Sequence, residues 1–221
     1  MTSNTLERRP LTMLAVESAI CGGSLALFHG ADLLVASGGS STVSRAEELL
    51  LKIKDLVTNT VGSISEINSI AVSIGPGSFT GLRIGISTTM GLGKALQIKC
   101  SGVSLFDAMA TLSTEGKLVL TAVPLGKRDA CFQLRKRNDK GFGVHAQPRT
   151  VPLSDLVSAI SELQPSSIVY HGDLESRIRP LSAIEMIDAG SNMAEVIGRC
   201  AMNTPVNHDL TPIYAQSPRF V

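Results

Sequence analysis

Glu17, followed by Ser18, stands at the end of the mostly apolar run 11–16, where its carboxylate could carry chemistry. A carboxylate in such a place can position a metal-bound water or a phosphate through its hard oxygen atoms. It can also serve the fold alone, by accepting hydrogen bonds from backbone N–H groups of the next loop. The sequence leaves both roles open, and we favour the structural one.

A second candidate is the glycine-rich stretch 75–85, GPGSFTGLRIG, which turns an expected strand at 69–74 directly into a helix. Glycine accepts positive φ and proline offers no ladder donor, so the strand must end there. The N–H groups at the start of the helix could bind a phosphate. No Gly-Lys-Ser/Thr follows, as a P-loop would need. Gly75 and Gly77 therefore predict either a nucleotide contact or a packed corner that shapes a partner surface.

The helix expected from Thr80 to Leu96 is rich in small residues. Gly81, Gly85 and Thr89 recur at four-residue intervals. Because glycine costs a helix interior about 1 kcal/mol relative to alanine, we expect another element to come close here. Such spacing brings two helices together. We therefore predict a helix–helix interface in a soluble protein.

Motifs for other chemistry are missing from the sequence. No His-Glu-x-x-His or Gly-x-Ser-x-Gly motif occurs, and the four histidines are scattered without ligand spacing, at His29, His145, His171 and His208. These absences argue against a zinc protease and a serine hydrolase. Lys127-Arg128-Asp129 is interpreted as a solvated turn.

The composition indicates a globular protein with little affinity of its own for nucleic acid. Hydrophobic residues make up 43% of the chain, and 20 basic against 19 acidic residues leave a formal charge of +1. A nucleic-acid-binding domain would be distinctly basic. The four cysteines form no C-x-x-C pair and are expected to be reduced and buried: Cys21, Cys100, Cys131 and Cys200. No signal peptide or membrane span is predicted, so we expect a cytoplasmic protein.

The order of expected elements predicts an α/β fold with an internal repeat. Residues 11–112 predict the order β-β-β-α-β-α-β-α, with a helix from Ser44 to Val57 that is capped by Ser44 and Glu47. That order is the ribonuclease-H-like unit, which actin-like ATPase (ASKHA) folds contain twice. We expect a flexible tail at 1–10, a first lobe at 11–114 and a shortened second lobe at 115–221. The second lobe is expected to include a helix over 152–163 and a closing helix over 192–202.

Residues 75–85 resemble, almost letter for letter, the GPGSFTGLRIG signature of the TsaB (YeaZ) family. That family is the bacterial partner of TsaD in making the N6-threonylcarbamoyl modification of tRNA adenosine. The resemblance is strongest from Leu11 to about Ala110. It implies a non-catalytic partner of TsaD, needed for modification of adenosine 37 in tRNAs that read codons beginning with A. It also implies a TsaD heterodimer, a larger assembly with TsaE, a homodimer when alone, and only indirect contact with tRNA.

The resemblance also implies a partner surface on the first lobe. Its expected residues lie on the helices 44–57 and 80–96: Leu49, Leu50, Ile53, Gly81, Arg83, Gly85 and Thr89. Arg83 either makes a polar contact there or simply extends along the surface. We expect no catalytic residue and no metal ligand, because Leu105 and Met109 align with the metal-binding histidine pair of TsaD. Neither side chain can bind a hard cation.

No tightly bound cofactor is expected, and ATP or ADP with Mg²⁺ at the boundary with TsaD is the candidate. The nucleotide contacts would come from Glu17, Ser18, Gly75 and Gly77. Two departures weaken a transfer of roles from the family. Glu17-Ser18 replaces the usual Asp-Thr, and Arg45-Ala46 replaces a His-Ser pair at the first helix. The alternative function is an actin-fold ATPase or kinase that acts alone through Glu17 and the loop 75–77.

Overall fold

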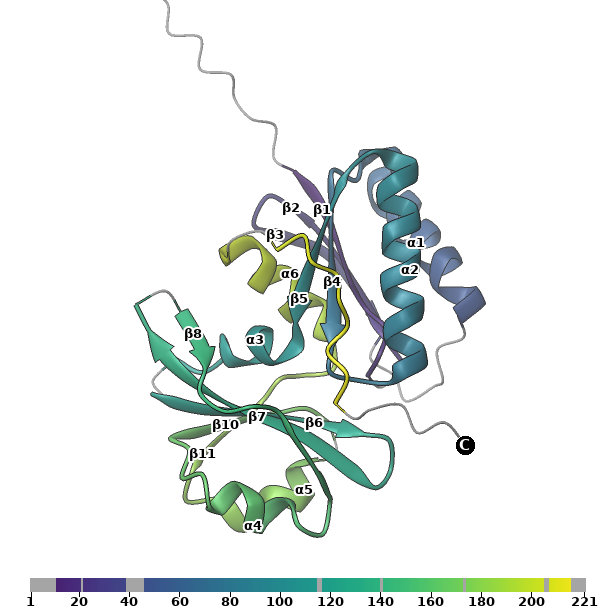
Figure 1. Cartoon of the computed structure of the whole chain (residues 1–221). Helices are drawn as coiled ribbons and strands as arrows, with labels where there is room; N and C mark the ends of the chain where they lie inside the picture. Colours follow the sequence, from purple (N-terminus) through teal and green to yellow (C-terminus); the bar gives the residue numbers. More distant parts are fainter. Residues whose placement is uncertain are drawn as a thin grey trace, which may run out of the picture.

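The computed structural model describes residues 11–20, 22–38, 46–114, 117–139, 141–172, 174–204 and 207–215, which form two stacked lobes (Figure 1). Each lobe is built on one β-sheet, and helices cover both faces of each sheet. The tail 1–10, the capping residue Ser44 and Arg45 lie outside the described residues. No helix in these ranges is long and apolar enough to cross a membrane.

The first lobe contains a five-stranded sheet in the order β3-β2-β1-β4-β5. Strands β1 to β3 are antiparallel neighbours, and β4 and β5 run parallel to β1. The strands occupy β1 Thr12–Glu17, β2 Ser24–His29, β3 Asp32–Gly38, β4 Ser69–Gly75 and β5 Lys99–Ser104. β1 and β4 carry mainly buried residues, because helices lie on both of their faces.

The second lobe repeats this arrangement. Its sheet has the order β11-β10-β6-β7-β8, again with one antiparallel meander and two parallel strands, and a further strand, β9, pairs with β7. The repeat confirms the predicted α/β class and the predicted duplication. The strands occupy β6 Leu118–Leu125, β7 Asp129–Asn138, β8 Gly141–Val144, β9 Arg149–Pro152, β10 Ser167–Tyr170 and β11 Glu185–Asp188.

Two long helices, α1 (Ala46–Val61) and α2 (Phe79–Leu96), cover the outer face of the first sheet (Figure 1). α2 begins one residue before the predicted Thr80, and the Ser78 hydroxyl caps it by accepting a hydrogen bond from the Gly81 N–H at 3.3 Å. It ends at Gln97, whose φ of 56° is left-handed. A short 3-10 turn, η1 (Ile64–Glu66), precedes β4. The outer helices bury one side each, in a core that includes Leu14, Ile70 and Val72.

The helices of the second lobe are short. α4 (Leu156–Ser161), α5 (Leu174–Ile178) and the 3-10 turn η2 (Arg179–Leu181) pack on the outer face of its sheet. The helix predicted over 152–163 is wrong at its start. β9 takes residues 149–152, because they pair with β7, and Ser154 donates to the Asp155 carboxylate instead of capping a helix.

Between the sheets lie α3 (Leu105–Ala110) and α6 (Met193–Asn203), in a core that both lobes share. α6 packs mainly on β1, β2 and β4, so it belongs spatially to the first lobe. Gly198 permits this approach, since a Cβ there would lie 2.8 Å from the Phe28 ring carbon Cζ. The closing helix predicted at 192–202 is confirmed, with Asn192 as its N-cap.

The described C-terminal segment, residues 207–215, also returns to the first lobe and runs along β5 (Figure 1). Gly102 N–H donates to the Asn207 carbonyl at 2.9 Å, and Ile213 N–H donates to the Ile74 carbonyl at 2.7 Å. The predicted second lobe at 115–221 therefore needs correction, because α6 and this segment complete the first lobe. The contacts that bring them back are far apart in the sequence.

Candidate functional site

Glu17 is held by its own loop. Its side chain is 1% exposed, and its Oε1 accepts hydrogen bonds from the N–H groups of Ala19 at 2.6 Å and Ile20 at 3.0 Å. Burial raises the pKa of the Glu17 carboxyl to about 7, and the backbone N–H groups oppose that shift only in part. The geometry matches the structural role expected of a strand-end carboxylate.

The small side of α2 faces this same loop. The Ser18 hydroxyl donates to the Gly81 carbonyl at 2.8 Å. A Cβ on Gly81 would lie 2.8 Å from the Ala19 Cα, and one on Gly85 would overlap the Ser18 hydroxyl. Something does come close to the glycines, as predicted, but it is the loop after β1 and not a partner helix. Gly81 and Gly85 are therefore internal packing positions, and a partner contact at either of them stays a prediction.

Gly75 and Gly77 are also packed against the protein itself. Gly75 has a φ of 104°, and a Cβ there would lie 2.6 Å from the Ile213 carbonyl oxygen. A Cβ on Gly77 would lie 2.5 Å from the Ala19 Cβ, and the Ser78 N–H donates to the Ala19 carbonyl at 2.9 Å. These contacts describe a packed strand–helix corner. The nucleotide contacts predicted for Glu17, Ser18, Gly75 and Gly77 stay predictions.

Two predicted interface residues of α1 are core residues, since Leu49 and Ile53 are buried beneath the helix. Thr89 of α2 is buried as well. Their place as partner contacts is therefore wrong, because the apolar side of an amphipathic helix packs first on its own sheet. Leu50, by contrast, is 50% exposed, as the prediction requires.

The exposed side of these helices carries large apolar side chains, which we call the outer patch. It consists of Leu50 and Leu51 of α1 and Met90 of α2, which are 50%, 60% and 55% exposed. Around Met90, the outward side of α2 has the exposed residues Arg83, Ser87 and Lys94 at helical spacing. Of the interface residues predicted on these helices, Leu50 and Arg83 lie on the exposed side, and the partner interface itself stays a prediction.

Arg83 is exposed and lies over the ring of Phe79, with its Cζ 3.9 Å from the ring centroid. Its Nε donates to the Tyr214 hydroxyl at 3.5 Å, and the rings of Phe79 and Tyr214 have centroids 5.1 Å apart. Arg83 thus links the start of α2 to the C-terminal segment. Whether it also contacts a partner stays a prediction.

Leu105 and Met109, which the resemblance predicts to align with metal ligands of TsaD, are apolar and buried. Leu105 and Met109 have no exposed surface and belong to the core between the lobes. Across the described ranges, no group of three or more His, Cys, Asp or Glu side chains could hold a metal ion. Cys131 and Cys200 are buried and Cys100 is partly buried, while Cys21 lies outside the described residues.

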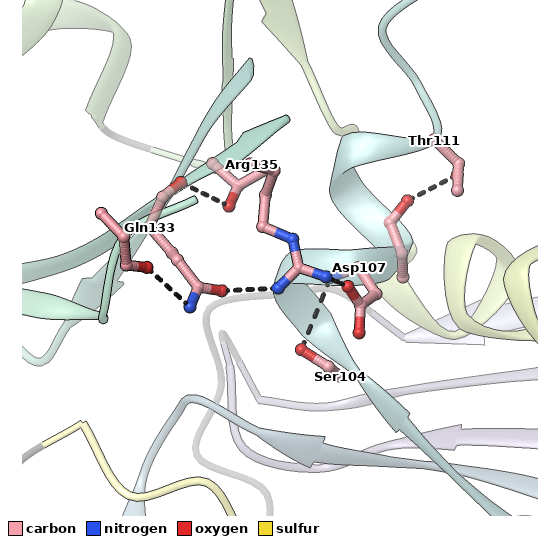
Figure 2. Close-up of polar contacts among 8 residues, drawn as sticks. Ser104, Asp107, Thr111, Gln133 and Arg135 are labelled. Carbon is pink, nitrogen blue, oxygen red and sulfur yellow. Dashed lines mark hydrogen bonds and ion pairs between the residues drawn. The ribbon is translucent and has the colours of Figure 1, made fainter. Parts of the chain in front are cut away.

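A polar cluster that sequence reasoning missed lies between the lobes (Figure 2). Arg135 of β7 is 5% exposed; its guanidinium donates to the Gln133 amide oxygen at 2.9 Å and pairs with the Asp107 carboxylate of α3. Gln133 in turn donates to the Ala146 carbonyl at 3.1 Å. The alternation of Gln133, Arg135 and Arg137 along one strand was the available signal, since alternate residues share a face.

This polar cluster borders a cavity of about 660 Å³ between the lobes. Its walls come from β5, α3, β7, β8, α6 and the C-terminal segment. The volume lies within the range of small-molecule sites. Burial lowers the pKa of Arg135, and the nearby Cys200 thiol acts in the opposite direction.

Comparisons with known proteins agree with the signature. A family model described as "TsaD: tRNA N6-adenosine threonylcarbamoyltransferase" matches residues 41–124. The tRNA threonylcarbamoyladenosine biosynthesis protein TsaB of Escherichia coli (strain K12) is 32% identical over 100 residues, 45% of this chain and 43% of that protein. The protein of the same name from Haemophilus influenzae is 26% identical over 163 residues, 70% of this chain and 68% of that protein. The chain spans about half, or less, of the length of the first curated relatives that it matches.

Solved structures share the fold over nearly the whole chain. YeaZ from Pseudomonas aeruginosa superposes with a TM-score of 0.62 at 18% identity, covering 92% of this chain and 99% of that one. A Bacteroides thetaiotaomicron protein described as having an actin-like ATPase fold superposes with a TM-score of 0.50 at 10% identity, covering 93% of this chain and 100% of that one. At these identities the likeness shows the fold alone. The predicted fold class, two ribonuclease-H-like lobes, is confirmed.

Proposed function

We propose that the chain belongs to the TsaB (YeaZ) family of the actin-like ATPase fold and acts in tRNA threonylcarbamoyladenosine biosynthesis. The observation that carries this proposal is the stretch 75–85, which builds the strand–helix corner and matches the family signature. Relatives from two bacteria that match this chain are named for that pathway.

Within that pathway, we propose that the chain is a non-catalytic partner of TsaD in the cytoplasm. TsaD would transfer the threonylcarbamoyl group to adenosine 37 of tRNAs that read codons beginning with A. The near-neutral charge supports indirect contact with tRNA. The apolar Leu105 and Met109 support a lack of metal chemistry at those positions. A larger assembly with TsaE is part of the same proposal.

The outer patch supplies the surface that this partnership needs. Exposed large apolar side chains on neighbouring helices are typical of protein–protein contacts. The TsaD family model matches residues 41–124, a range that includes α1 and α2, so TsaD is expected to carry equivalent helices. Two similar helix pairs can pack face to face around a pseudo-twofold axis. The same geometry would allow a homodimer when TsaD is absent.

The pathway role is tested by reconstituting threonylcarbamoyl transfer with TsaD from the same organism. The reaction uses threonylcarbamoyl-adenylate and tRNA, with and without this chain. We expect transfer to depend on the chain. Transfer that proceeds equally well without it contradicts the proposal.

ATP or ADP enters the proposal only at the boundary with TsaD. Gly75 and Gly77 pack against the protein itself, and the Glu17 carboxylate accepts a hydrogen bond from its own loop. These contacts support a structural role for the strand–helix corner, without nucleotide turnover, in the isolated chain. We therefore expect no nucleotide hydrolysis by the chain alone. Hydrolysis that is lost on Glu17→Gln would favour the alternative, an actin-fold ATPase or kinase that acts alone.

A further inference from the structure

The inner face of β7 is unusual for a strand that faces a helix. Its alternate residues Gln133 and Arg135 are each 5% exposed, and Arg137 continues the same face toward solvent. Burying a guanidinium and its carboxylate partner costs several kcal/mol per ion, so a well-packed apolar pair often does as well or better. Stability alone therefore does not account for a charged residue here.

The Arg135 guanidinium is only partly satisfied. One terminal nitrogen donates to Gln133 and the other pairs with Asp107, but the buried Nε has no hydrogen-bond partner among the described residues. The Asp107 side chain is 40% exposed, so it can turn toward solvent when another anion takes its place beside the guanidinium. Ser104 lies beside the same pair (Figure 2). The pair is thus built so that another acceptor could compete for the arginine.

The cavity beside this pair presents a second cation and a flat surface. The Arg137 guanidinium stacks on the Phe142 ring, with its Cζ 4.4 Å from the centroid, and both residues line the cavity. The charged side chains among the described lining residues are Arg135, Arg137 and Asp107, which leave one excess positive charge. Hydroxyl and amide groups complete the polar part of the lining: Ser101, Ser104, Thr111, Asn203, Thr204 and Asn207.

We propose that this cavity between the lobes binds a small anion that bears a carboxylate or phosphate group. Arg135 and Arg137 would hold the anion, because a planar guanidinium presents paired donors that fit either group. Asp107 would act as a built-in competitor, which occupies Arg135 until the anion displaces it. The site uses β7, α3 and the C-terminal segment, and its described lining residues include neither the outer patch nor Glu17, Ser18, Gly75 and Gly77.

The competition gives opposite effects for two kinds of substitution. Removing a cation, in Arg135→Gln or Arg137→Gln, is expected to weaken anion binding about tenfold, equivalent to about 1.4 kcal/mol. Removing the competing charge, in Asp107→Asn, is expected to tighten binding by a similar factor. Arg149→Gln is the matched control, because it removes an exposed arginine of β9 that does not line the cavity.

Isothermal titration calorimetry of the full-length chain tests this, with inorganic phosphate and citrate as probes at constant ionic strength. Circular dichroism confirms that each variant folds, and exposed Arg137 provides a test even if Arg135→Gln does not fold. Tighter binding by Asp107→Asn, with weaker binding by Arg137→Gln, supports the site. A preference for phosphate or citrate identifies the group that is bound. Failure to bind either probe, weaker binding by Asp107→Asn, or an equal loss in Arg149→Gln would overturn it.

Discussion

Globular proteins usually bury apolar side chains and expose polar ones. The outer patch of the first lobe and the inner face of the second lobe each reverse one half of this rule. The outer patch exposes the apolar side chains Leu50, Leu51 and Met90. The inner face of the second sheet buries polar side chains instead, at Thr121, Gln133, Arg135 and Ser167. Exposed apolar patches and buried polar groups are the informative exceptions in a globular protein.

The difference indicates two kinds of contact. An apolar surface gains free energy when another protein covers it, because apolar area leaves water. A buried polar surface gains when a ligand supplies hydrogen bonds that the fold does not complete. The first sheet shows what a purely structural inner face looks like, with Met13, Ala15 and Phe28 packed against α6.

Glu17 is a buried acidic residue of the first lobe. If it were buried as a charge for a ligand, the two lobes would differ less. The Glu17 pKa of about 7 lies above the ordinary value of 4.5, so the folded state holds the proton more tightly than the unfolded state. The stability from Glu17 is complete below about pH 4.5 and is lost as the pH rises through 7.

Relative to Glu17→Gln, the wild-type free energy of unfolding should therefore fall by about 3 kcal/mol between pH 4.5 and 7. Urea unfolding at a series of pH values measures the difference. Parallel pH profiles for the two proteins would mean that the fold does not protonate this carboxyl.

The two sides of α2 provide the next test. A Cβ on Gly81 would press on the backbone of Ser18 and Ala19, so Gly81→Ala should destabilise the fold by about 2 to 3 kcal/mol. Gly91 is exposed and has open space around it, so Gly91→Ala should stabilise by about 1 kcal/mol. Chemical denaturation of both variants checks the pair. Effects of the same sign would contradict the assignment of inner and outer sides.

A double substitution tests whether the Arg135–Asp107 pair on the inner face of the second lobe is needed for stability. Arg135→Met leaves Gln133 and Asp107 without their donor, which should cost about 2 kcal/mol of stability. Adding Asp107→Leu should restore stability to within about 1 kcal/mol of wild type, because apolar pairs can replace buried ion pairs. A double variant that is no more stable than Arg135→Met alone would show that the fold needs the ion pair for stability.

The smallest expected effect on stability belongs to the outer patch. Met90→Glu changes an exposed side chain, so the free energy of unfolding should move by less than about 0.5 kcal/mol. Thermal unfolding of the isolated chain measures this. A large loss would mean that Met90 already supports the fold and is not available to a partner.

Much of the fold could be predicted because its signals are local. The strand at 69–74, its stop at Gly75 and the helix that follows lie within one short stretch, and the structure confirms all three. The repeat followed from the order of the elements. The return of α6 to the first lobe could not be predicted, because it depends on the fit of Gly198 beside Phe28.

The site was harder to predict, because spacing shows that a neighbour must exist without identifying it. Gly81 and Gly85 required a close neighbour, and the fold supplied the Ser18 loop where a partner helix was expected. Arg135 drew no prediction, because its surroundings depend on Asp107, which α3 brings to it. Contacts between residues distant in the sequence decide both cases.

The most direct test of the proposed partnership is the light-scattering mass of the chain mixed with TsaD from its own organism. We predict a heterodimer for the wild type and for Val144→Glu, a matched control at an exposed apolar residue of β8. Met90→Glu should abolish it, because a carboxylate in the outer patch would be buried without a partner. A heterodimer that survives Met90→Glu would contradict the outer patch as the surface, and no association of the wild type would contradict the partnership itself.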